Sequence, residues 1–136
     1  MRVLAIDYGR ARVGLAVAHE EGGLPRPLLV LHLTGAFWSK LRDVVEEWEV
    51  GRIVVGLPVL GEGEEGEMAV EVREFAEKVG RETGVDVELW DERLTTWEAK
   101  GVLQNRGVSE RRQRGKRDSV AAALLLERYL RARGVQ

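Results

Sequence analysis

Carboxylates are the side chains of this sequence whose types and positions best suit chemistry. Those that are expected where sites usually form are Asp7, Asp91, Glu92 and Asp118. Ligand sites in α/β sheets lie beyond the carboxyl ends of strands, where Asp7 and the Asp91–Glu92 pair are expected. Because grouped carboxylates repel one another, they need a cation, and Mg²⁺ or Mn²⁺ takes oxygen ligands. These positions therefore predict a metal site that hydrolyses phosphodiesters, in which the metal polarises the phosphate and activates water.

Each of these carboxylates also has a purely structural explanation. Asp7 could be a turn residue, and the Asp91–Glu92 pair could form a surface turn with Arg93. Asp118 is expected at the start of a helix, where the helix dipole favours an acid. The two histidines and three serines have no partner nearby in the sequence, which disfavours a hydrolytic triad. A site is therefore expected only if the carboxylates gather in space.

A basic segment lies directly before Asp118. Positions 106–117 carry six basic side chains and one acid, Glu110. These charges would repel one another unless a partner neutralises them, so phosphate contact is expected, with a solvated loop as the alternative. The residues expected to bind nucleic acid are Arg10, Arg12, Arg93, Arg106, Arg111, Arg112, Arg114, Lys116 and Arg117.

The composition indicates an ordinary intracellular protein. A chain of 136 residues, 44% of them hydrophobic, fits a single domain over residues 1–136. It has no cysteine, so disulfide and thiol chemistry are excluded. No apolar run approaches the ~18 residues of a membrane helix, and the first residues do not resemble a signal peptide. We expect a cytoplasmic monomer or homodimer that does not contact membranes.

The elements that must position the carboxylates follow from hydrophobic periodicity. Short apolar runs predict strands over residues 2–7, 12–18, 28–33, 52–58 and 85–90. Apolar residues at helical spacing predict helices over 37–50, 67–83 and 118–133, with Gly51 and Gly84 ending the first two. A capping box at Thr95–Glu98 predicts a short helix to about Gln104, and loops are expected over 21–25, 59–66 and 105–117. Hairpins followed by strand–helix alternation predict an α/β fold with a mixed sheet covered by helices.

Four segments together resemble the YqgF family, also called RuvX. This family comprises proteins described as pre-16S rRNA nucleases and as Holliday-junction-resolvase-like proteins. The segments lie in family order and spacing over essentially the whole chain: Asp7–Val17, Ile53–Pro58, Asp91–Thr96 followed by Glu98-Ala99, and Lys116–Ala122 with Leu126–Leu130. One departure follows Pro58, where the family usually has an Asn-Met-Asp-Gly-Ser/Thr loop and this chain has Val-Leu-Gly-Glu-Gly-Glu.

The resemblance implies a ribonuclease H-like fold with sheet order 3-2-1-4-5. It also implies maturation of the 5′ end of small-subunit ribosomal RNA, and it makes Asp7, the Asp91–Glu92 pair and Asp118 the metal-binding acids. Between the paired acids we favour Glu92, because it is longer and lies past the strand end. Strand alternation places Asp91 and Glu92 on opposite faces, so one of them is expected to face the metal.

Several functions remain open at this point. The leading hypothesis is a Mg²⁺- or Mn²⁺-dependent endonuclease acting on structured RNA, with Asp7, Glu92 and Asp118 as ligands. A second is cleavage of branched DNA by the same site. A third, from another class, is a non-catalytic nucleic-acid-binding factor for ribosome maturation. Asp7, Gly9 and Gly14 also resemble the phosphate loop of actin and sugar-kinase ATPases, but those folds need two such domains.

Overall fold

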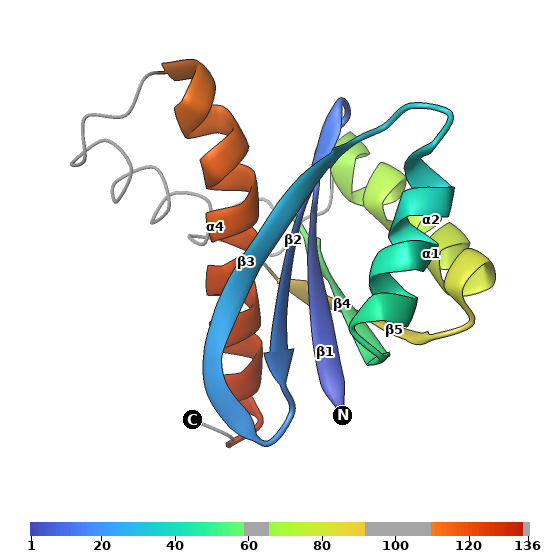
Figure 1. The fold of residues 1–136 in the computed structure, drawn as a ribbon. Coiled ribbons are helices and arrows are strands. Elements are labelled where there is room, and N and C mark those ends of the chain that lie inside the picture. Colours follow the sequence, from blue (N-terminus) through green and yellow to red (C-terminus); the bar gives the residue numbers. More distant parts are fainter. Residues whose placement is uncertain (59–65, 92–109, 135–136) are drawn as a thin grey trace.

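Five strands form one mixed sheet at the centre of the molecule (Figure 1). The computed structural model describes residues 1–58, 66–91 and 110–134, with side chains from Asp118 onward in the last range. The strands are β1 (Arg2–Tyr8), β2 (Arg12–His19), β3 (Gly22–His32), β4 (Val50–Leu57) and β5 (Asp86–Asp91), in the order β3-β2-β1-β4-β5. β1, β2 and β3 pair antiparallel, whereas β4 and β5 run parallel to β1. The predicted α/β fold and its 3-2-1-4-5 order are confirmed.

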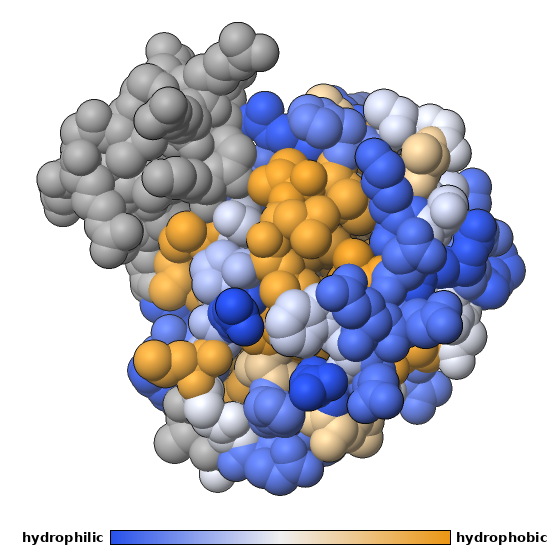
Figure 2. Space-filling view, in the orientation of Figure 1, coloured by the Kyte–Doolittle hydropathy of each residue, from blue (hydrophilic) through white to orange (hydrophobic). Residues whose placement is uncertain are grey.

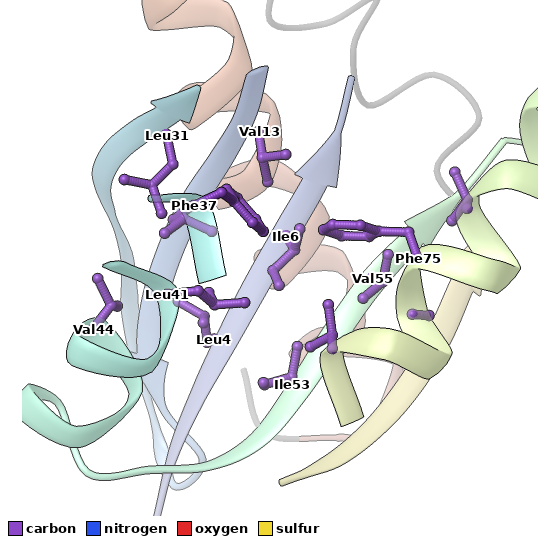
Figure 3. Close-up of a cluster of buried hydrophobic side chains, with 14 of the residues drawn as sticks. Leu4, Ile6, Val13, Leu31, Phe37, Leu41, Val44, Ile53, Val55 and Phe75 are labelled. Carbon is purple, nitrogen blue, oxygen red and sulfur yellow. The ribbon is translucent and has the colours of Figure 1, made fainter. Parts of the chain in front are cut away.

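Strand alternation divides the side chains of the sheet between two cores. Leu4 and Ile6 of β1 face helices α1 (Phe37–Glu47) and α2 (Glu67–Thr83). Figure 3 shows this core, in which Phe37, Leu41 and Phe75 cover the β1 side chains. Successive strand residues point to opposite faces, so the odd-numbered residues of β1 face the other way. Asp7 is an odd-numbered residue of β1, so it faces away from α1 and α2.

The second face of the sheet is covered by helix α4 (Glu110–Ala132) (Figure 1). Leu125, Leu126 and Tyr129 are fully buried against this face. The strand residues beneath them are small or β-branched: Val3, Ala5, Ala16, Ala18 and Val54. Small side chains let the helix backbone approach the strands closely, so α4 is held at a short distance from β1 and β2.

The last helix begins earlier than the sequence predicted. Residues 110–117 were expected to lie in the loop over 105–117, but the helix starts at Glu110. Apolar periodicity begins only at Val120, so it marks the buried part of the helix and misses its first turns. Arginine, glutamine and lysine are good helix formers, and they outweigh the helix-weakening Gly115. The short helix predicted over 95–104 and most of the loop over 59–66 lie outside the described residues.

The edge strand β3 also begins earlier than expected. The loop predicted over 21–25 is wrong, because β3 starts at Gly22, which pairs with His19 in a tight hairpin and has φ +128°. Pro25 and Pro27 are tolerated because an edge strand leaves one row of backbone groups unpaired. Leu24 and Leu29 of this strand are exposed, and Figure 2 shows apolar surface in the region where Figure 1 draws β3.

The ends of α1 and α2 show different chain reversals. α2 ends at Gly84, as predicted, in the left-handed conformation with φ +71°. α1 instead ends at Glu47, and the turn passes through Trp48 and through Glu49 with φ +51°, so Gly51 does not end the helix and lies inside β4. Among the described residues, no helix combines the length and apolar character needed to cross a bilayer.

Candidate active site

Asp7 lies on the face of the sheet that α4 covers. It is the next-to-last residue of β1, and Val3 and Ala5 on the same side of the strand belong to the core under α4. Its side chain is the one buried charged group among the described residues, at 8% exposure. A carboxylate withdrawn from water needs a counter-charge or hydrogen-bond donors. Its burial therefore distinguishes Asp7 from an ordinary turn residue.

Asp118 reaches the same place from α4. The register partner of Asp7 in β2 is Gly14. The backbone carbonyl of Asp118 packs directly on Gly14, so closely that a Cβ atom at that position would overlap it. The absent side chain lets the helix rest on the strand at this point. Asp7 and Asp118, from the first strand and the last helix, are therefore both neighbours of Gly14.

The position of Asp118 within α4 removes its simplest structural explanation. The helix starts at Glu110, so Asp118 lies eight residues, or about 12 Å, from its first residue. The helix dipole acts mainly on charges within the first turn. Capping or dipole stabilisation does not account for an acid at this position.

Arg12 pairs with the Asp118 side chain. Its Nε atom donates a 2.6 Å hydrogen bond to Oδ2 of Asp118, and the two side chains are 30% and 27% exposed. Arg12 lies two positions before Gly14 in β2 and thus on the same face. Sequence reasoning expected a phosphate contact here and missed the ion pair. The alternation of Gly14, Ala16 and Ala18 was the signal that this strand face receives a helix.

Arg10 makes the matching contact on the opposite face. Its Nε atom lies 2.8 Å from Oε2 of Glu71 in α2. Both side chains are well exposed, at 62% and 40%. The hydrogen bond to Glu71 raises the pKa of Arg10, and burial raises the pKa of the neighbouring Tyr8. The short stretch from Arg10 to Arg12 is thus attached to a helix on each side of the sheet.

Asp91 does not share the face of Asp7. It is the last residue of β5, and its register partner is Leu57, which belongs to the core under α1 and α2. Register partners in a parallel pair point to the same side of the sheet. Of the paired acids at this strand end, Asp91 thus faces away from Asp7, while Glu92 lies outside the described residues.

Part of the predicted site lies outside the residues that the structure describes. Arg93 and Arg106 are outside the described residues, and only the backbone is described for Arg111, Arg112, Arg114, Lys116 and Arg117. Within the described ranges, no group of three or more metal-ligating side chains is found. The structure therefore brings two of the three predicted ligands, Asp7 and Asp118, to one place.

Comparison with known proteins identifies the family of this chain. Residues 1–132 match the family model described as "RuvX: Holliday junction resolvase". The chain belongs to the RuvX family. A RuvX relative named "Putative pre-16S rRNA nuclease" from Anaeromyxobacter sp. (strain Fw109-5) is 47% identical and aligns over 98% of each chain. A protein of the same name from Escherichia coli (strain SE11) is 36% identical, over 93% of this chain and 94% of its own.

A solved structure confirms the fold of this RuvX chain. T. thermophilus RuvC in complex with a Holliday junction substrate matches 99% of this chain and 97% of its own, with a TM-score of 0.60 and 21% identity. At this identity the match concerns the fold alone. The family resemblance and the ribonuclease H-like fold predicted from the sequence are both confirmed.

Proposed function

We propose that this protein is a metal-dependent endonuclease that hydrolyses phosphodiester bonds in structured nucleic acid. The observation that carries the proposal is the convergence of Asp7 and Asp118 on Gly14. One acid is buried and the other lies mid-helix, so neither position is explained by a turn or a helix end. The naming of the RuvX relatives favours pre-16S ribosomal RNA as the substrate, and we propose its 5′ end as the region that is cut.

The residues present fit a hard divalent cation. Asp7 and Asp118 supply carboxylate oxygens, the ligands that Mg²⁺ and Mn²⁺ prefer. We propose Glu92 as the third ligand, because Asp91, the other acid of the pair, ends β5 on the face away from Asp7. When bound, the cation would polarise the phosphate and lower the pKa of water.

The protein's own groups would bind and orient the nucleic acid. The first turns of α4 and the segment before it carry the basic side chains of positions 106–117. Positions 106–117 directly precede Asp118 in the sequence, so we expect a nucleic-acid strand bound by them to pass close to the carboxylates. Arg10 and Arg93 are the remaining proposed phosphate contacts, and Arg10 can reach one only by leaving Glu71.

The decisive experiment compares cleavage by wild type, Asp7→Asn and Asp118→Asn. The substrates are a pre-16S rRNA fragment that includes its 5′ extension and a four-way junction of DNA, each with Mg²⁺, Mn²⁺ or EDTA. Wild type should cut the RNA with either metal, whereas both variants and the EDTA reactions should be at least about 100-fold slower. Asp43→Asn, on the exposed side of α1, is the matched control.

Cleavage of branched DNA is the second candidate, favoured by the description of the RuvX model. Preferential cutting of the four-way junction would select it over the RNA nuclease. If neither substrate is cut with either metal, the enzyme is excluded. Full function of Asp7→Asn in cells would instead favour a non-catalytic maturation factor.

A further inference from the structure

A short ion pair on the α4 face involves Arg12, a residue with no assigned role in the proposed chemistry. Arg12 Nε and Asp118 Oδ2 are 2.6 Å apart, joining β2 to the middle of α4. Both side chains are about one-third exposed, so water screens this contact less than a surface pair. Charge-assisted hydrogen bonds of this length are among the stronger ones in proteins. The pair therefore fixes the orientation of the Asp118 carboxylate.

Arg12 is also a neighbour of the second acid, Asp7, in the sheet. Asp7 stands directly opposite Gly14, so Arg12 is its diagonal neighbour across the β1–β2 pair. Diagonal neighbours in an antiparallel pair are separated by roughly 7–8 Å. Two carboxylates brought together repel one another, and a nearby positive charge reduces that repulsion. Arg12 is placed to do this for Asp7 and Asp118 together.

We infer that Arg12 is a positioning residue for the proposed metal site. By holding Oδ2 of Asp118, it would leave Oδ1 to ligate a divalent cation. This inference rests on the proposed function, and it replaces the phosphate contact that the sequence suggested for Arg12. Lysine would supply the charge without the planar guanidinium whose Nε holds Oδ2, so the role is specific to arginine.

Metal binding measured without any substrate tests this role directly. Mn²⁺ affinity is determined by calorimetry for wild type, Arg12→Gln and Arg12→Lys. Loss of a group that orients a metal ligand typically weakens affinity about 10–100-fold. Arg12→Gln should fall in this range and Arg12→Lys between it and wild type. Arg42→Gln, which removes the exposed ion pair with Glu82, should bind Mn²⁺ as wild type does.

Two results of this experiment would overturn the inference. Tighter Mn²⁺ binding by Arg12→Gln would mean that the guanidinium competes with the cation for Asp118. Unchanged Mn²⁺ affinity would also overturn it, and weaker binding of the RNA in EDTA, measured by fluorescence anisotropy, would then make Arg12 a phosphate contact.

A metal-free measurement separates this inference from the proposed function. The melting temperatures of Arg12→Gln, Asp118→Asn and the double variant form a cycle that reports whether the two residues interact. The decrease in the double variant should be clearly smaller than the sum of the single decreases. If the decreases in melting temperature are additive, the inference is overturned even though wild type binds Mn²⁺. Absence of Mn²⁺ binding by wild type would overturn the proposed function, and the cycle would still report on the Arg12–Asp118 pair.

Discussion

Replacing Gly14 with alanine should displace the part of α4 that carries Asp118. A Cβ atom at this position overlaps the Asp118 carbonyl oxygen and its carbon. The strand cannot retreat, because Val13 and Leu15 on its other side are fully buried under α1 and α2. Hence α4 must move away from the sheet, by roughly 1 Å or more to restore a normal contact distance.

The size of the effect follows from this overlap. Adding a methyl group to a packed interior costs about 1–3 kcal/mol in the free energy of unfolding. For a domain of this size each kcal/mol corresponds to roughly 3–5 °C in melting temperature, so a decrease of about 3–15 °C is expected. A shift of ~1 Å at a catalytic group can slow a reaction about 100-fold, so cleavage should fall more than stability alone explains.

Calorimetry and the RNA cleavage assay measure the two effects. Gly35→Ala is the matched control, because a Cβ atom there meets nothing within 4 Å, and it should change neither quantity. Cleavage is compared at a temperature at which both variants are fully folded. A Gly14→Ala protein that melts and cuts like Gly35→Ala would refute the close packing of Asp118 on β2.

Three further predictions concern the scaffold. Gly84→Ala should cost about 1 kcal/mol in urea unfolding, because alanine is strained at the left-handed φ of +71° that ends α2; an unchanged midpoint would contradict this. Leu125→Ala should cost about 2–5 kcal/mol, because this side chain is fully buried between α4 and the sheet, and a loss under 1 kcal/mol would show that the site collapses freely. Burial raises the pKa of Tyr8 above its usual 10.0, so tyrosinate absorbance should show Tyr8 ionising late. The folded state then holds the Tyr8 proton more tightly than the unfolded state. The contribution of Tyr8 to the free energy of unfolding is complete below pH 10 and is lost as the pH rises through the folded pKa. Tyr8→Phe should abolish this pH dependence.

The sheet could be predicted because its strands have short-range signals. Each is a short apolar run between turn residues, and their order along the chain left few arrangements. The starts of β3 and α4 could not be predicted, because Gly22–Pro27 and Glu110–Arg117 carry no apolar period. The start of β3 is set by the register of its hairpin with β2, and the start of α4 is set by intrinsic helix propensity.

The site could be predicted as residue types and not as contacts. Asp7 and Asp118 were recognisable from their places at the ends of apolar segments. Which face of the sheet each acid occupies depends on strand parity, and parity follows only once the register is known. The roles of Gly14 and Arg12 depend on how closely α4 approaches β2, which periodicity alone does not report.

The ion pair between β2 and α4 also concerns the order of synthesis. Arg12 and Asp118 are 106 positions apart, and Asp7 lies earlier still. At ordinary rates of translation the ribosome needs roughly 5–20 s to add that length of chain. A growing chain thus holds Asp7 without its partner acid for most of its synthesis. The two acids can consequently come together only after α4 has been synthesised and has docked on the sheet.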